Sequence, residues 1–127
     1  AAAIPRRAWP PRTHPATRVF LALRVEVNRE YETLEAVLPQ AFELLAPGGR
    51  LVVISFHSGE DRRVKTFMRA LTEPRRAPWP LPEAEEPAPA EWVARRALKA
   101  DDDECRRNPR SRSARLRAID LCAHITG

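Results

Sequence analysis

The sequence predicts an α/β fold, because a helical pattern, an apolar strand and a capped helix follow one another. Apolar residues recur at three- and four-residue steps over 17–45, as in an amphipathic helix. The turn at 47–49 ends this stretch. Residues 50–56 are an apolar, β-branched run without polar alternation, typical of a central strand buried on both faces. Ser58, three residues before an acid, opens the next helix as a capping box, which completes half of a doubly wound architecture.

The helical stretch itself is expected to hold two helices. Thr17 is a suitable N-cap residue for the first. Pro39 interrupts the apolar pattern, and a proline breaks a helix interior but is tolerated at the first position of a new helix. We therefore expect a bend before Pro39. Residues 1–16 are rich in proline and arginine without periodicity, and they predict an irregular entry segment.

After the capped helix we expect a loop without regular structure, and a strand at the end of the chain. Six prolines fall between residues 73 and 89, so we expect a Pro-rich loop at 73–90. A short helix is predicted over 91–99. Residues 114–122 alternate and predict a final strand. Residues 17–127 would then form one unit.

Composition limits the classes of protein to consider. The 127 residues allow at most one domain of ordinary size, and no apolar run reaches the roughly 20 residues of a membrane span. Cys105 and Cys122 fit no CxxC spacing and are expected to be reduced thiols of a cytoplasmic protein. Twenty arginines against two lysines, with a net charge of +5, favour a nucleic-acid partner, because the arginine fork binds phosphate in a bidentate manner.

His57 is the first candidate site residue. It follows the carboxyl end of the predicted strand, where α/β sheets bind ligands. With Ser55 and Ser58 beside it, His57 has the chemistry to position a base or a phosphate. In the alternative interpretation His57 and Ser58 only cap the helix, and both interpretations stay open. The pair Glu60 and Asp61 is explained by the dipole of the first helical turn.

The densest basic cluster spans 106–117. Arg110 and Arg112 share a parity, so in an extended chain they would point the same way as a pair of phosphate forks. A solvated strand edge is the alternative. The other histidines, His14 and His124, do not form a metal-ligand spacing with His57, and the sequence contains neither a Gly-rich nor a P-loop motif for a cofactor phosphate.

Three ordered stretches together carry a family resemblance. They are HPATR at 14–18, the strings PGGRL, SFHS, EDR and VK within 47–65, and NPR with RS and LR within 108–117. The set resembles the ribosomal RNA small-subunit methyltransferase H family, whose members methylate N4 of a cytidine in 16S rRNA with S-adenosylmethionine. The chain departs from the family at Leu21, where a Gln is usual, and at Gly59, where a Leu is usual.

The resemblance implies the C-terminal part of a Rossmann-like class I methyltransferase sheet. In the family the Gly-rich loop and the other cofactor contacts precede the HPATR string, so no cofactor-binding residue is expected here and the S-adenosylmethionine site would lie mainly outside this chain. The N-terminal strands of the sheet would be lacking. The implied partners are small-subunit rRNA and the N-terminal half of the enzyme, in the cytoplasm.

Carried over residue by residue, the resemblance places Ser55, His57 and Ser58 on the active-site side of the sheet, near the entering cytidine. It identifies no catalytic proton acceptor among them. The arginines implied to contact RNA are Arg18, Arg110 and Arg112.

Two other hypotheses remain open from the sequence. One is a non-catalytic RNA-binding fragment whose arginines clamp phosphate. The other is a truncated product that does not fold independently, because its sheet would expose an apolar edge.

Overall fold

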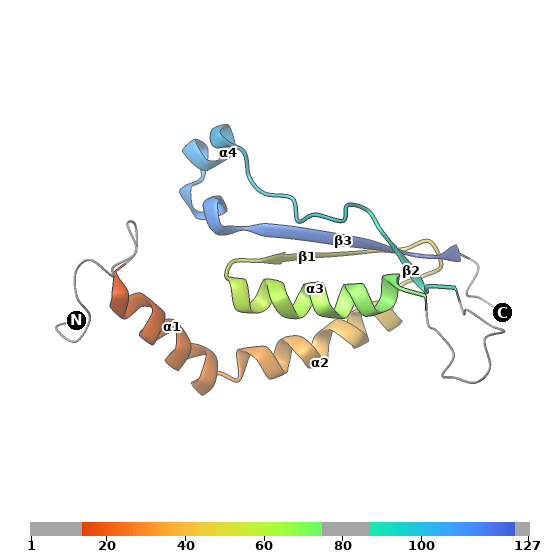
Figure 1. The fold of residues 1–127 in the computed structure, drawn as a ribbon, viewed down its shortest axis with the longest axis horizontal. Coiled ribbons are helices and arrows are strands. Elements are labelled where there is room, and N and C mark those ends of the chain that lie inside the picture. The colour runs from red at the N-terminus through yellow and green to blue at the C-terminus, as the bar shows by residue number, and fades with distance from the viewer. Residues whose placement is uncertain (1–13, 75–86, 124–127) are drawn as a thin grey trace.

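The computed structural model describes residues 14–74 and 87–123, and helices from the first of these ranges cover one face of a small sheet (Figure 1). The elements, in chain order, are α1 (Pro15–Val27), α2 (Glu30–Glu43), β1 (Arg50–Ser55), α3 (Ser58–Thr72), β2 (Ala90–Trp92), α4 (Asp102–Arg107), the 3₁₀ helix η2 (Pro109–Ser113) and β3 (Arg115–Leu121). The α/β class is therefore confirmed. No helix within the described ranges combines the length and the apolar character that crossing a membrane requires.

The sheet is antiparallel, with the strand order β1-β3-β2. The β1–β3 register runs from Arg50 opposite Asp120 to Ser55 opposite Arg115. β1 is thus an edge strand, and the expectation of a strand buried on both faces is wrong for the described residues. Val52 and Ile54 are 48% and 53% exposed, because the helices described here cover only the other face.

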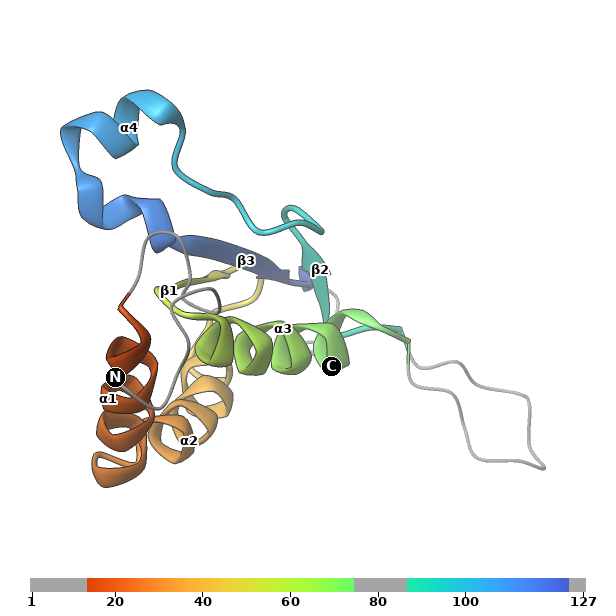
Figure 2. The same ribbon diagram turned by 60° about the vertical axis from the view of Figure 1, so that its left-hand side comes forward.

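α3 is the centre of the core. It lies between the sheet and α2, and the two views of the ribbon agree on this order (Figures 1 and 2). Val64 and Met68 on α3 pack with Leu38 of α2 and Ile119 of β3, and all four are at most 3% exposed. Burying these side chains contributes on the order of 1.5–3 kcal/mol each. This core fixes the start of α3, and with it the loop that follows β1.

The first two helices begin and end at different residues from those predicted. α1 starts at Pro15, with His14 rather than Thr17 as its N-cap, because His14 Nδ1 accepts from the Ala16 N–H at 3.2 Å. The break between the helices falls at Asn28 and Arg29, where Arg29 adopts a left-handed conformation with φ of 50°. The predicted bend before Pro39 is wrong, since this proline lies inside α2.

The segment after the proline-rich stretch also differs from its prediction. Residues 75–86 of that loop lie outside the described part of the chain, as do residues 1–13 of the entry segment and His124. Residues 91–99 do not form the expected helix. Instead Ala90–Trp92 pairs with β3, and Leu98 makes two 2.9 Å backbone hydrogen bonds with Leu116. Pairing with β3 prevails over the helical preference of an alanine- and arginine-rich segment.

The final strand is confirmed as β3, and a helix that was not predicted precedes it. Residues 101–104 are all acidic and form the N-cap and first turn of α4. Asp101 Oδ1 accepts from the Glu104 N–H at 2.7 Å, and the acids lie at the positive end of the helix dipole. Cys105 and Cys122 form no disulfide, and burial raises the pKa of the Cys122 thiol.

Candidate functional site

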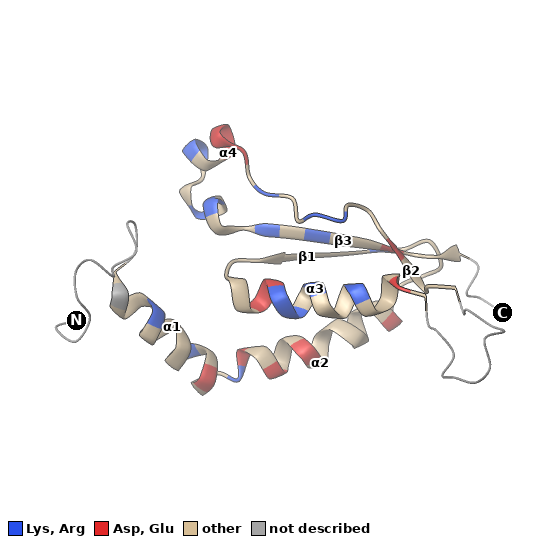
Figure 3. Ribbon diagram, viewed as in Figure 1, with Lys and Arg blue, Asp and Glu red and all other residues tan. Residues whose placement is uncertain are grey.

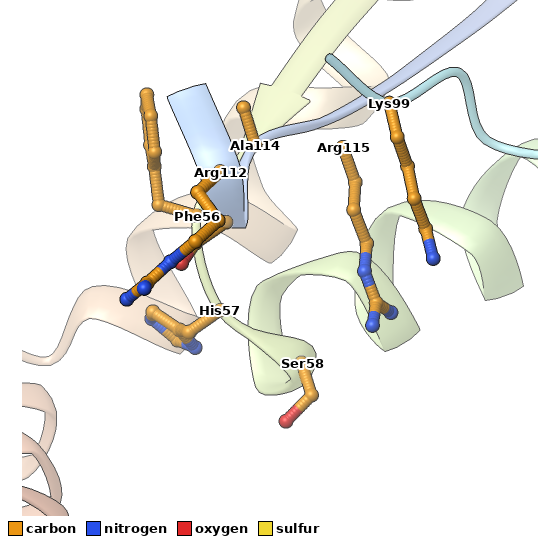
Figure 4. A pocket seen from close by; sticks show the side chains of 8 residues that line it. Phe56, His57, Ser58, Lys99, Arg112, Ala114 and Arg115 are labelled. Carbon is orange, nitrogen blue, oxygen red and sulfur yellow. The ribbon is translucent and has the colours of Figure 1, made fainter. Parts of the chain in front are cut away.

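A cavity of about 310 Å³ lies at the carboxyl end of β1, between the loop into α3 and the start of β3 (Figure 4). Its lining combines three cations with an aromatic ring, and none of its residues is acidic. The lining residues are Phe56, His57, Ser58, Lys99, Arg112, Ser113, Ala114 and Arg115. The cavity is therefore suited to an anion.

His57 holds the loop to the helix at this cavity. Its Nδ1 accepts from the Glu60 backbone N–H at 3.4 Å, and the Glu60 carboxylate accepts in return from the N–H groups of Phe56 at 3.0 Å and His57 at 3.4 Å. This capping box uses His57 and Glu60, so the prediction of Ser58 as the cap is wrong. An imidazole nitrogen supplies the same acceptor as a hydroxyl would.

The same contact restricts the chemistry of the ring. The nitrogen that accepts the backbone hydrogen bond carries no proton, and it faces Glu60. The other nitrogen, Nε2, is buried and lies 3.1 Å from Glu60 Oε1. A general base needs a nitrogen turned to its substrate. Because both nitrogens of His57 face Glu60, the described geometry supports a role in positioning the loop.

Glu30, His57 and Glu60 place ligand atoms within 4.8 Å of one another, which is the donor set of a metal site. Glu30 is already paired with Arg24 at 2.8 Å, and this contact lowers the pKa of the Glu30 carboxyl. Glu60 holds the cap. A metal ion would have to displace both sets of contacts, so we assign these side chains to the junction between α1, α2 and α3.

Asp61 interacts with the helix dipole and also forms ion pairs with two arginines of β3. It is 5% exposed, and its carboxylate accepts from Arg117 at 2.8 and 3.2 Å and from Arg115 at 2.9 Å. These hydrogen bonds, chiefly those of Arg117, lower the pKa of Asp61 against the opposing effect of burial. The explanation by dipole alone therefore missed a buried ion pair between α3 and β3.

The arginines implied to contact RNA are not brought together. Arg112 lines the cavity, but Arg110 does not. Both lie in η2, where Asn108 Oδ1 accepts from the Arg110 N–H at 3.3 Å, so the predicted extended alignment of the two side chains is wrong. Arg18 lies on α1, a helix whose main contacts are with α2.

The serines flanking His57 differ in position as well. Ser55 is 3% exposed, and its hydroxyl donates to the Arg115 carbonyl at 3.5 Å, so it lies between the strands and outside the cavity lining. Ser58 lines the cavity. Gly59, next along α3, makes room for the Tyr31 hydroxyl, which a Cβ at position 59 would meet. This contact gives a packing reason for the departure from the family at Gly59.

Sequence reasoning missed Phe56 and Lys99, and it named Arg115 only as part of a basic cluster. Lys99 reaches the cavity because the bridge between Leu98 and Leu116 brings its segment beside β3. No local pattern encodes this pairing. The position of Phe56, directly after the strand, was a usable signal.

The comparisons with known proteins identify the family of this chain. The chain belongs to the MraW methylase family, whose model matches residues 1–122. The resemblance drawn from the ordered motifs is thus confirmed.

The relatives carry a more particular name. The chain is 55% identical over 122 residues to the ribosomal RNA small subunit methyltransferase H of Anaeromyxobacter sp. (strain K), covering 94% of this chain and 39% of the relative. Proteins of the same name from Thermomicrobium roseum and Xanthomonas euvesicatoria are 51% and 50% identical, with 89% and 86% of this chain and 35% and 32% of the relatives covered. The chain therefore spans about two fifths of the length of the curated relatives or less.

Proposed function

We propose that this chain is the C-terminal part of an S-adenosylmethionine-dependent methyltransferase that methylates N4 of a cytidine in small-subunit (16S) rRNA in the cytoplasm. The observation that carries the proposal is the match of the family model over residues 1–122, together with 55% identity to a relative of that name. A cationic cavity beside the capped loop is what an RNA-modifying surface requires.

The cavity at His57 does not fit the cofactor. S-adenosylmethionine carries a positive sulfonium, and the cavity at His57 is lined by Lys99, Arg112 and Arg115 without a carboxylate. Like charges this close repel the ligand. The four glycines of the chain also form no Gly-rich loop. We place the cofactor site in the remaining part of the enzyme, and the chain alone is expected to be inactive.

The open face of the sheet supports a second structural partner. Val52 and Ile54 are about half exposed on β1, and the outer edge of β1 has no paired strand in the described residues. An exposed apolar edge strand is a template for further pairing. The part of the relatives beyond the matched 39% supplies enough chain to cover it. In this proposal the covering part completes a Rossmann-like class I sheet.

Within the proposal, Ser55, His57 and Ser58 lie on the side of the sheet where the target cytidine enters, and His57 and Ser58 line the cavity there. Their roles differ: Ser55 fixes β1 to β3, His57 fixes the loop, and the Ser58 hydroxyl is exposed at the cavity. The proton acceptor for the cytidine amino group then lies in the remaining part of the enzyme. Arg112, with Arg18 and Arg110 at a distance, would contact the RNA backbone.

Calorimetric titration with S-adenosylmethionine tests whether the cofactor site lies outside this chain. The isolated chain is expected to release no binding heat. A chimaera, in which this chain replaces the matching part of the Anaeromyxobacter relative, is expected to bind the cofactor. Micromolar binding by the isolated chain would overturn the assignment of the cofactor site.

A non-catalytic RNA-binding fragment is the second candidate, favoured by the same cationic lining. It predicts RNA affinity that falls steeply with salt and that survives substitution of Ser55 and His57, together with a chimaera that cannot transfer methyl groups. Methyl transfer by the chimaera would exclude it.

A further inference from the structure

A second cationic cavity adjoins the one at His57. Its volume is about 330 Å³, and six of its seven lining residues are cations. Lys99 and Arg115 line both cavities, so the two form one continuous surface. We define this surface as the basic track, made of Lys65, Arg95, Arg96, Lys99, Arg112, Arg115 and Arg117.

The fold builds the track from three separate segments together with Arg112 of η2. α3 contributes Lys65, the segment after β2 contributes the residues from Arg95 to Lys99, and β3 contributes Arg115 and Arg117. The paired hydrogen bonds between Leu98 and Leu116 hold the middle segment against β3. Figure 3 shows basic residues on these three segments. The convergence follows from tertiary pairing and not from a run of basic sequence.

The charges of the track are largely unneutralised. Among the described residues, Lys65, Arg95, Arg96, Lys99 and Arg112 make no ion pair or side-chain hydrogen bond, and neither cavity has an acidic lining residue. Asp61 alone pairs with Arg115 and Arg117. Clustered like charges raise the local potential and attract an anion with several negative charges.

Arg117 supplies an independent sign of a missing ligand. It is 7% exposed and lines the second cavity, and its Nη1 is buried with no hydrogen-bond partner. A buried guanidinium N–H without an acceptor is costly, and almost all such groups in native proteins have a partner. Asp61 already takes the Nε and Nη2 donors of Arg117. An acceptor oxygen from a bound anion would complete the set.

We propose that the basic track holds the phosphodiester backbone of an RNA strand, with consecutive phosphates in the two cavities. Seven cations over two joined cavities exceed what one small anion needs, whereas a strand supplies one negative charge at each nucleotide. Phe56, 56% exposed at the first cavity, offers a ring on which a base stacks. The inference deepens the proposed function, on which it rests, by naming where the rRNA backbone lies.

The test measures binding of a short single-stranded RNA to the 127-residue chain and to the chimaera at several salt concentrations. The track variant is Lys65→Gln with Arg95→Gln. The matched control is Arg62→Gln with Arg69→Gln, which removes two exposed charges from α3 outside both cavities. Each lost phosphate contact lowers the slope of log K against log salt by about 0.7 for a single strand, so the track variant loses about 1.4 and the control keeps the slope.

Circular dichroism of both variants checks that the fold is retained, as expected for exposed side chains. Equal losses in the track variant and the control, or no RNA binding by either parent protein at low salt, would overturn the inference. Displacement of the RNA by polyglutamate at equal charge concentration would also overturn it, in favour of an acidic protein segment. Methyl transfer to 16S rRNA by the parent chimaera is measured separately. A chimaera that transfers methyl groups although the track variant binds RNA like the control would contradict the track and leave the proposed function unaffected.

Discussion

The two faces of the sheet differ in what covers them. On the face towards α3, Ile119 is fully buried and Val53 packs against the core. On the opposite face Val52 and Ile54, from the same apolar run as Val53, are about half exposed. The difference shows that a strand of apolar, β-branched residues need not be covered on both faces by its own chain. We attribute the apolar character of Val52 and Ile54 to contacts with the remaining part of the enzyme.

The largest expected difference between the faces concerns their ion pairs. Asp61 on the covered face is buried against Arg117, whereas Asp120 on the open face makes an exposed pair with Arg50 at 2.6 Å. Breaking a buried pair costs about 3–5 kcal/mol and an exposed pair about 0.2–1 kcal/mol. Urea denaturation of Asp61→Asn and Asp120→Asn measures both. Equal free-energy losses would contradict the comparison.

The same buried pair predicts a dependence on pH. The pKa of Asp61 is lowered from its ordinary value of 3.8, so the folded state holds its charged form more strongly than the unfolded chain does. The stabilisation is complete above pH 3.8 and is lost as the pH falls below that value through the folded pKa. Unfolding free energies at stepwise lower pH should decline less in Asp61→Asn than in the parent chain. Parallel curves would show that other carboxyls dominate.

A matched pair of isoleucines compares the apolar packing of the two faces. Ile119→Ala leaves a cavity in the core and should cost about 2–5 kcal/mol, whereas Ile54→Ala on the open face should cost no more than about 0.5 kcal/mol in the isolated chain. In the chimaera the cost of Ile54→Ala should rise, because the open face is then covered. An unchanged cost in the chimaera would show that this face stays in solvent.

A smaller loss of stability than in the core is expected at the loop where β1 ends. His57→Ala removes the cap of α3 and should cost about 0.5–2 kcal/mol of stability. His57→Asn keeps a capping side chain and should cost less. In the chimaera we expect His57→Ala to lower methyl transfer by a larger factor than stability accounts for, and His57→Asn to restore most of it. A loss of turnover in His57→Asn as large as in His57→Ala would contradict the role of His57 in positioning the loop.

Sequence patterns predicted the elements that rest on local signals. The apolar run 50–56, the final strand and the helix after His57 all appear near their expected positions, and the ordered motifs identified the family. Boundaries failed where histidines took the capping role, at His14 and His57. These side chains compete with Ser and Thr as acceptors, and the usual capping preferences do not weigh them.

Long-range pairing was beyond the reach of the sequence. The strand Ala90–Trp92 and the bridge at Leu98 form only because β3 lies beside them, so the helix expected there was wrong and Lys99 was missed. The buried contact of Asp61 with Arg117 joins residues far apart in the chain and has no local signature. In the candidate site, the sequence therefore predicted the loop after β1 and Arg112, it included Arg115 only in a basic cluster, and it missed Lys99.

Methyl transfer by the chimaera tests the central claim most directly. Purified chimaera is incubated with small-subunit rRNA and S-adenosylmethionine carrying a labelled methyl group, and the digested RNA is analysed for N4-methylcytidine. The account predicts label in that nucleoside with the chimaera and none with the isolated chain or with the remainder of the Anaeromyxobacter relative alone. A folded, cofactor-binding chimaera that leaves the cytidine unmodified would contradict it.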